Sequence, residues 1–268
     1  MSDTISEPVT PPVSLQAHLT ARRDEGRKLL LPYVTAGVVP DWVELVDAVI
    51  EAGADAVEIG IPFSDPAMDG PTIQQASDQA LGNGITPAGA LDALRGREFG
   101  VPLIAMTYYN LVYRHGPARF AADLAAAGLS ATILPDLPIE AAGEWEAAAA
   151  AHGIENVLLA APVSSDERLA MLGERTHGFL YAVSTMGTTG ERDQLDTAAS
   201  VLARRIKAVT DVPVLIGFGI STPDHAVTAA RVSDGVITAS ALMRTLLDGG
   251  SIDDVAKQVA AMRAALDA

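Results

Sequence analysis

The 268-residue sequence contains no cysteine, only three lysines and few aromatic residues, which make up 4% of the chain. Without cysteine, disulfide bonds, thiolate nucleophiles, cysteine-ligated zinc and iron–sulfur clusters are excluded. The chain carries 34 acidic against 18 basic residues, a formal net charge of −16. Nucleic-acid backbones and anionic membrane surfaces both attract clusters of Lys and Arg, so we expect neither as a partner.

Segments that would direct the chain to or across a membrane are also missing. The stretch MSDTISEPVTPPVSL has no basic region followed by an apolar run, so no signal peptide is expected. No apolar run reaches about 18 residues without a charge or a turn residue, so no transmembrane helix is expected. We therefore expect a cytoplasmic protein.

Short apolar runs recur along the chain, each followed by a Gly/Pro/Asp/Ser loop and a longer amphipathic stretch. Residues 1–14 precede this rhythm, and we predict a flexible N-terminal tail there, with one catalytic domain over 15–268. Continuous apolar runs are typical of parallel strands covered on both faces. The predicted strands are 29–35, 55–61, 102–108, 130–135, 156–162, 178–184, 213–219 and 234–240.

Eight strand–helix units without a break in composition predict an α/β fold, a single (β/α)₈ TIM barrel. An open, doubly wound sheet is the alternative, but no G-x-G-x-x-G fingerprint follows the first strand. Thr86-Pro87 and Thr222-Pro223 indicate helix starts, because proline at the first helical position lacks only an N–H that would stay unpaired. Gly53, Gly128 and Gly153 indicate helix ends.

Two carboxyl groups are the strongest candidates for chemistry. In such barrels the reacting groups lie at the C-terminal ends of the strands and in the loops that follow. Glu58 interrupts the second apolar run, and Asp69 follows in a loop rich in Gly and Pro. Two carboxyls in one pocket would have separated pKa values, which suits acid–base catalysis. The alternatives are an outward-facing, salt-bridged Glu58 and an Asp69 that caps a turn.

The segments GFGIS and TAS, after the seventh and eighth strands, predict a phosphate site. Each leads into a helix, whose free N–H groups and dipole attract an anion without Arg or Lys, although a plain tight turn is the alternative. None of the three lysines ends a strand, so a Schiff-base mechanism is not expected. The five histidines lack the spacing of a metal triad, so we expect no metal. These exclusions leave carboxylate acid–base chemistry on an anionic, aromatic substrate as the expected chemistry.

The segment VEIGIPFSDPAMDGPTIQ, residues 57–74, resembles the signature of the tryptophan synthase α subunit family. LPYVTAG, MTYYNLVYRHG, LPDLPIE and GFGIST also match in the family's order, so the resemblance covers 28–247. The resemblance implies a carbon–carbon lyase of tryptophan biosynthesis. It would cleave indole-3-glycerol phosphate to indole and glyceraldehyde 3-phosphate by a retro-aldol reaction that needs no cofactor.

The same resemblance implies roles for individual residues. Glu58 matches the family's catalytic glutamate, which would protonate indole C3 and accept the proton of the glycerol C3′ hydroxyl. Asp69 matches the catalytic aspartate, which would hold the indole N–H. The residues implied to contact the substrate are Tyr33, Ile73, Tyr108, Ile133, Tyr181, Thr189 and Phe218. Those implied to form the phosphate cradle are Gly190, Gly219, Ala239 and Ser240.

The sequence departs from the family in two places. Ala239 stands where the family commonly has Gly, which puts a methyl group beside the phosphate. The segment STMGTTG, 184–190, lacks an arginine that often precedes the family's Gly-x-Thr-Gly, although it keeps Thr189, which is implied to contact the catalytic aspartate when the lid closes. We expect this second departure to affect lid dynamics more than chemistry.

The family works as an αββα heterotetramer in which indole passes to a β subunit, so pyridoxal phosphate is expected only in that partner. Asp65, Pro66 and Asn110 match the contact surface, and we expect a half-apolar loop over 110–114 there. Two alternatives stay open: a stand-alone indole-releasing lyase, and a catalytically silent barrel that binds and activates a β subunit. The presence of Glu58 and Asp69 argues against the silent barrel.

Overall fold

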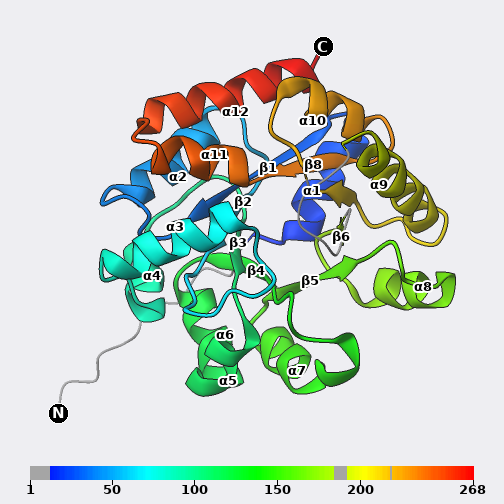
Figure 1. The fold of residues 1–268 in the computed structure, drawn as a ribbon. Coiled ribbons are helices and arrows are strands. Elements are labelled where there is room, and N and C mark those ends of the chain that lie inside the picture. Colours follow the sequence, from blue (N-terminus) through cyan, green and yellow to red (C-terminus); the bar gives the residue numbers. More distant parts are fainter. Residues whose placement is uncertain (1–12, 184–191, 218) are drawn as a thin grey trace.

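Eight parallel strands close into one barrel in the computed structural model, which describes residues 13–183, 192–217 and 219–268 (Figure 1). Each strand pairs with its neighbour in the chain, and β8 pairs with β1. This closure confirms the predicted (β/α)₈ barrel and rules out the open sheet. The strands are β1 (Leu29–Thr35), β2 (Val57–Gly60), β3 (Leu103–Met106), β4 (Leu129–Ile133), β5 (Glu155–Ala160), β6 (Leu180–Ala182), β7 (Val214–Ile216) and β8 (Gly235–Thr238).

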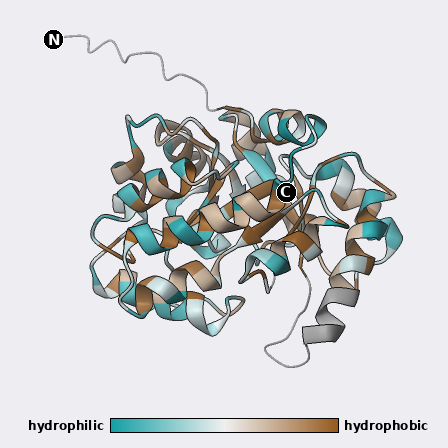
Figure 2. Cartoon of the chain, turned by 90° about the horizontal axis from the view of Figure 1, so that it is seen from above, coloured by the Kyte–Doolittle hydropathy of each residue, from teal (hydrophilic) through white to brown (hydrophobic). Residues whose placement is uncertain are grey.

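Helices surround the barrel and turn polar faces outward, while the strands in its middle are hydrophobic (Figure 2). Within the described residues, none of them combines the length and the apolar character needed to cross a bilayer. The helices are α1 (Leu15–Asp24), α2 (Trp42–Glu51), α3 (Pro71–Gly82), α4 (Pro87–Leu94), α5 (Tyr109–His115), α6 (Pro117–Ala126), α7 (Gly143–Ala151), α8 (Asp166–Arg175), α9 (Arg192–Lys207), α10 (Pro223–Ala230), α11 (Ser240–Leu247) and α12 (Ile252–Leu266), with a 3₁₀ turn, η1 (Ile139–Ala141).

The predicted helix boundaries are confirmed where local chemistry sets them. Thr86 caps α4 by accepting a hydrogen bond from the Gly89 N–H at 3.0 Å. Thr222 caps α10 in the same way, three residues before His225. Gly53 follows α2 with a φ of +106°, a left-handed conformation that side chains disfavour.

The loop predicted over 110–114 is wrong, because helix α5 spans Tyr109–His115. The carboxylate of Asp136, in the loop after β4, accepts the Tyr109 N–H at 2.8 Å and so satisfies a free donor of the first turn. Arg114 and His115 occupy the last turn, where the helix dipole favours positive charge. Gly116, with a φ of +94°, ends the helix.

Apolar side chains fill the barrel interior up to the level of the candidate site. Odd-numbered positions of β1 and even-numbered positions of β2 and β3 point inward, as Leu31, Ala56 and Ile104 show by sharing one buried cluster. Helix α1 closes the N-terminal end of the barrel with Leu15 and Leu19, which are completely buried in the same cluster. The barrel floor is therefore closely packed, and the opposite end remains for function.

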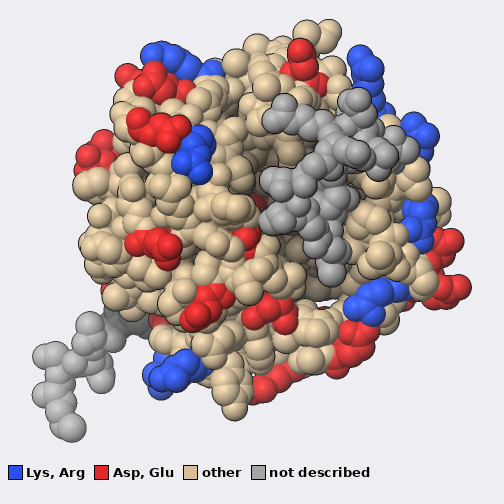
Figure 3. All heavy atoms as spheres, viewed as in Figure 1, with Lys and Arg blue, Asp and Glu red and all other residues tan. Residues whose placement is uncertain are grey.

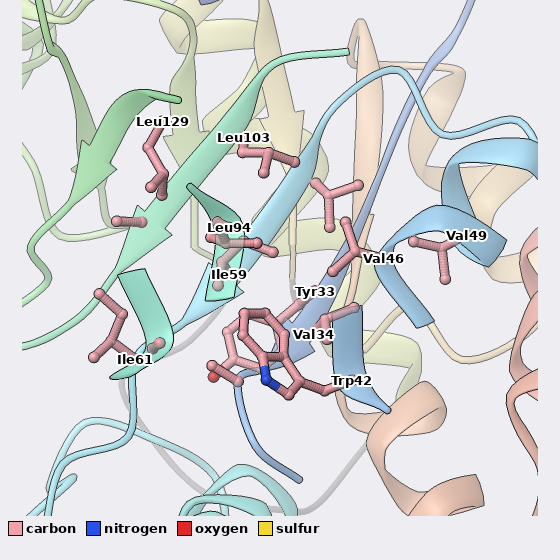
Figure 4. Packing of buried hydrophobic residues seen from close by; sticks show 14 of the residues in the cluster. Tyr33, Val34, Trp42, Val46, Val49, Ile59, Ile61, Leu94, Leu103 and Leu129 are labelled. Atoms are coloured by element: carbon pink, nitrogen blue, oxygen red, sulfur yellow. The ribbon is translucent and has the colours of Figure 1, made fainter. Parts of the chain in front are cut away.

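A second apolar layer lies between the strands and the helices. Val34 of β1 and Ile59 of β2 face outward and belong to one buried cluster with Val46 of α2 and Leu94 of α4 (Figure 4). Burial of each such side chain contributes about 1.5–3 kcal/mol to folding. These strands are thus held from both sides, which fixes the positions of the residues at their C-terminal ends.

A buried ionic cluster ties the chain ends to the base of the barrel. Asp55, which precedes β2 and is almost fully buried, accepts hydrogen bonds from Arg27 Nε at 2.6 Å and from Arg263 Nη1 of α12 at 3.2 Å. It also accepts the Leu30 N–H at 2.9 Å. Arg263 itself is 7% exposed, so its buried charge depends on the carboxylate of Asp55.

We expect Asp55→Ala to destabilise the fold by about 3–5 kcal/mol, because it leaves the buried Arg263 charge without its internal partner. Asp267→Ala, which removes the half-exposed partner of the same arginine, should cost less than about 1 kcal/mol. Urea unfolding followed by circular dichroism measures both changes. Equal losses in the two variants would contradict a stabilising role for the buried pair.

Candidate active site

Glu58 lies inside the barrel, near the C-terminal end of β2, and its residue is 1% exposed. It follows the inward-facing Ala56 by two positions, and its register partners are Tyr33 on β1 and Ile104 on β3. The outward, salt-bridged alternative is therefore wrong. Carboxyl atom Oε1 has no hydrogen-bond partner among the described residues. Burial without a donor raises the pKa of Glu58 to about 8.

Asp69 reaches the same end of the barrel from the loop between β2 and α3. Its Oδ2 accepts a hydrogen bond from the Tyr108 hydroxyl at 3.0 Å, and this hydroxyl accepts the Met68 N–H at 3.0 Å. The Tyr108 ring stacks on Phe63, with the ring centres 5.1 Å apart. Burial raises the pKa of Asp69, and the bond from Tyr108 partly opposes that rise. The side chain of Asp69 is thus held by a tyrosine rather than used to cap its own turn.

Two buried tyrosines feel the charge of both carboxyls. Tyr33 and Tyr181 are each 6% exposed. Burial is the main cause that raises the pKa of each phenol, and the charges of Glu58 and Asp69 raise both further. Each phenol is therefore within electrostatic reach of both carboxyls, which is consistent with Glu58 and Asp69 lying at the same end of the barrel.

Two glycines make room for these rings, a role that was not predicted for either of them. A Cβ atom on Gly60 would lie 1.8 Å from the Tyr33 hydroxyl oxygen. A Cβ atom on Gly217 would lie 2.2 Å from the Tyr181 hydroxyl, which donates to the Gly217 carbonyl at 3.4 Å. Gly60 stands two residues after Glu58 and therefore on the same face of the strand, and this spacing in the sequence could have indicated that it borders the site.

The remaining residues expected at the substrate divide between the two apolar layers. Ile133 of β4 belongs to the interior cluster that contains Tyr181. Ile73, in the first turn of α3, belongs to the cluster that contains Tyr33. Both lie on elements that border the pocket, while Thr189 and Phe218 lie outside the described residues.

One of the two predicted anion sites is a helix N-terminus in the structure. Helix α11 starts directly after β8, with Ala239 as its N-cap and Ser240 as its first residue. The Met243 N–H is the first to bond within the turn, to the Ala239 carbonyl at 3.1 Å, so the preceding N–H groups point out of the helix. Ala239 has a φ of −130°, so no left-handed conformation requires glycine at this position.

The second predicted anion site has a different geometry. Gly219 is exposed and has a φ of +78°, but α10 begins only at Pro223, so its amide belongs to the loop and not to the helix. Gly190 lies outside the described residues. In the described part of the chain, no cluster of three or more His, Asp or Glu side chains is arranged to hold a metal ion.

The residues expected at a partner lie on the outer surface of the same end. Asp65 and Asn110 are exposed, and Pro66 is partly buried. Asp65 is engaged locally, because the Ser64 hydroxyl donates to its carboxylate at 2.8 Å. A hollow is seen near the centre of the face in Figure 3, where acidic side chains are scattered rather than gathered in one patch.

The fold and this site define the class: a (β/α)₈ barrel with two carboxyl groups and a free helix N-terminus at the C-terminal ends of its strands. Residues 19–267 match the family model described as tryptophan synthase alpha chain. Tryptophan synthase alpha chains of Salinispora arenicola and Mycobacterium avium are 46% and 43% identical over 233 residues. These alignments cover 86% of this chain and 87% and 86% of the relatives.

Solved structures agree with the sequence relatives. A Mycobacterium tuberculosis tryptophan synthase chain superposes with a TM-score of 0.86 at 40% identity, covering 94% of this chain and 97% of that one. The Legionella pneumophila alpha subunit has a TM-score of 0.85 at 30% identity, covering 95% and 99%. The chain belongs to the tryptophan synthase alpha chain family.

The raised pKa of the buried Glu58 predicts how the stability of the fold depends on pH. Its pKa rises on folding from 4.5 to about 8, so the folded state binds the proton more tightly and stability falls as pH rises through that window. We expect Glu58→Gln, which stays neutral, to unfold several degrees above the parent at about pH 8.5, with the difference shrinking towards about pH 5. Thermal unfolding across this range measures it. Glu98→Gln, in an exposed loop, serves as the control, and a pH-independent difference for Glu58→Gln would refute the shifted pKa.

Proposed function

We propose that this chain cleaves indole-3-glycerol phosphate to indole and glyceraldehyde 3-phosphate, with Glu58 and Asp69 as the catalytic residues. The reaction breaks the bond between indole C3 and the glycerol chain. Indole is a poor leaving group until C3 is protonated, and cleavage of that bond then restores the aromatic ring. The site must therefore supply a proton at carbon and remove one from the C3′ hydroxyl.

The environment of Glu58 fits the first of these tasks. With a pKa near 8 the carboxyl is mostly protonated at neutral pH, so it can donate to C3 as a general acid. The resulting carboxylate is then the base that takes the C3′ hydroxyl proton. As the electrons of the broken bond return to the ring, the hydroxyl carbon becomes the aldehyde. Each such transfer is worth about 10²–10⁴-fold in rate.

Asp69 fits the second requirement, stabilisation of the indole nitrogen. Protonation at C3 leaves positive charge on the ring nitrogen, and a nearby carboxylate that accepts the N–H lowers the energy of that state. The hydroxyl of Tyr108 fixes the orientation of Asp69 by its 3.0 Å bond to Oδ2. The two carboxyls thus have different roles because, among the described residues, Asp69 has a donor that stabilises its charged form and Glu58 Oε1 has none.

The substrate's two ends match the two kinds of surface in the site. We assign the indole ring to the apolar wall that includes Tyr33, Ile73, Tyr108 and Ile133, with Tyr181 beside the glycerol chain. We assign the phosphate to the N-terminus of α11 at Ala239 and Ser240, together with Gly219. Thr189, Gly190 and Phe218 are proposed to complete the site from outside the described residues.

The observation that carries this proposal is the buried carboxyl of Glu58, whose Oε1 has no partner among the described residues, within electrostatic reach of the same tyrosines as Asp69. A barrel that only bound or activated a partner would have no need of a carboxyl held at this free-energy cost. We therefore favour the catalytic barrel over a silent one.

We expect Glu58→Gln to abolish indole formation while leaving binding of a non-cleavable indole-alkyl phosphate unchanged. Asp69→Asn should lower kcat by about 10²-fold or more, because it removes the charge that stabilises the ring nitrogen. Indole release and calorimetric titration measure the two effects. Asp78→Asn, on the exposed side of α3, is the matched control. Retention of more than a few per cent of activity by Glu58→Gln would overturn the assignment.

We further propose that a tryptophan synthase beta chain binds over the C-terminal end of the barrel and receives the indole. Three of the large apolar side chains that are exposed lie in segments that follow strands at this end: Met68 after β2, Tyr113 in α5 and Val163 after β5, with exposures of 54%, 66% and 83%. Exposed apolar groups gathered at one end of a molecule are typical of a docking surface. Asp65, Pro66 and Asn110 border it.

In this arrangement pyridoxal phosphate belongs to the beta chain and this chain holds no cofactor. An αββα assembly follows if two such pairs meet through their beta chains. The acidic composition and the biosynthetic role support a cytoplasmic location for the complex.

Addition of the beta chain is expected to raise the turnover of indole release, because docking orders the loops around the pocket. Tyr113→Asp should weaken the complex at least tenfold, about 1.4 kcal/mol. Sedimentation and the indole assay measure both. Val209→Asp, near the opposite end before β7, is the control and should bind normally. An unchanged rate at saturating beta chain would favour a stand-alone lyase.

A further inference from the structure

The hydroxyl groups around the site differ in whether their protons are already donated. Tyr108 donates to Asp69, and Tyr181 donates to the Gly217 carbonyl. Thr107, after β3, donates to the Ile61 carbonyl at 3.2 Å. Because each of these hydroxyl protons is already donated to an acceptor, it is not free to stabilise a negative charge that forms elsewhere in the site.

Two hydroxyls on β1 are not committed within the described part of the chain. Thr35 Oγ1 is buried and has no hydrogen-bond partner there. The Tyr33 hydroxyl likewise donates to no described residue; burial and the charges of Asp69 and Glu58 raise its pKa, and the Thr35 side chain, two residues along the same strand, partly opposes that rise. A buried hydroxyl without a partner is costly, so this pair points to an acceptor that is present in only part of the reaction.

The register of the barrel places this pair beside Glu58. Tyr33 is the direct partner of Glu58 across β1 and β2, and Thr35 is the partner of Gly60. The 1.8 Å approach computed for a Cβ on Gly60 puts the phenol oxygen directly over the inward side of β2, one side-chain step beyond Glu58. Only glycine at position 60 lets the phenol occupy this place.

Glu58 is the acceptor that this pair fits. Its Oε1 is buried without a partner, which is tolerable while the carboxyl is protonated. After the carboxyl has given its proton to the substrate, the same site holds a negative charge. A buried carboxylate requires at least one donor, and Tyr33, the register partner of Glu58, carries a hydroxyl proton that no described residue accepts.

We propose that Tyr33 and Thr35 are positioning residues that form a hydroxyl relay, in which Thr35 donates to Tyr33 and Tyr33 donates to the Glu58 carboxylate. The proposal rests on the proposed role of Glu58 and extends it. No proton is transferred along the relay: the phenol keeps its proton, and Glu58 gives one proton to C3 and takes one from the C3′ hydroxyl. The relay lowers the energy of the carboxylate between these two steps.

Tyr33→Phe tests the relay because it removes one oxygen and keeps the ring in the apolar wall. Loss of a donor to the charged form should raise the pKa of Glu58 by about one unit, so the alkaline limb of kcat/KM moves to higher pH by that amount. We expect kcat to fall about tenfold at neutral pH with KM changed less than twofold. A residue that merely lines the pocket would instead change KM and leave the pH profile in place.

Thr35 supplies the matched pair of variants. Thr35→Val keeps the shape and removes the hydroxyl, and should shift the alkaline limb in the same direction as Tyr33→Phe but by less. Thr35→Ser keeps the donor and should restore the parent profile. Melting curves establish that each variant is folded before its kinetics are compared.

A direct measurement of the protonation of the Glu58 carboxyl distinguishes a failure of this inference from a failure of the proposed function. Infrared difference spectra between the parent and Glu58→Gln follow the Glu58 carboxyl band as the pH changes, without any turnover. The same comparison in a Tyr33→Phe background gives the change in the pKa of Glu58. If the parent chain forms no indole, the proposed function fails, yet an upward shift in Tyr33→Phe still supports the relay. If the parent is active and Tyr33→Phe alters neither this pKa nor the pH profile, the relay is wrong and the function stands.

Discussion

The desolvation of one carboxyl group, Glu58, sets the requirements for everything around it. A carboxyl inside an apolar barrel is stable only as the neutral acid or with donors aimed at its charge. The closed barrel supplies the apolar surroundings, because strands paired all round leave no edge through which water reaches the interior. Helix α1 closes the opposite end with Leu15 and Leu19. The same packing that stabilises the fold therefore raises the pKa of the group that we propose as the catalytic acid.

Close packing and reactivity are reconciled by the glycines at the ends of two strands. The rings of Tyr33 and Tyr181 occupy space that a side chain on Gly60 or Gly217 would fill. The rings are buried at the same end of the barrel as Glu58, and their hydroxyls bring polar atoms within electrostatic reach of it. A core filled with aliphatic side chains would have been equally dry but would hold no donor. The small residues thus place donors inside an apolar site without opening it.

The sequence allowed the fold to be predicted because each strand is a continuous apolar run and each helix start carries its own signal, as Thr86-Pro87 does. The helix α5 was missed because its start depends on Asp136, a side chain from another loop. Glu58 stood out as an acid in an apolar run. The match between Gly60 and the Tyr33 hydroxyl could not be read from the sequence, because it depends on the register between β1 and β2. Periodicity fixes the face of a residue, and only closure of the barrel fixes its neighbours.

A protein with a formal charge of −16 is an unusual host for a phosphate ester, and the local groups explain how the two are compatible. Charges farther than about 8 Å from the ligand are screened at physiological ionic strength, so groups near the site dominate. The N–H groups at the start of α11 provide partial positive charge there without a lysine or arginine. Protonated Glu58 then removes one negative charge from the pocket while the anion binds. In the proposed reaction the raised pKa would therefore serve binding as well as proton transfer, whereas a carboxyl that stayed ionised at neutral pH would weaken both.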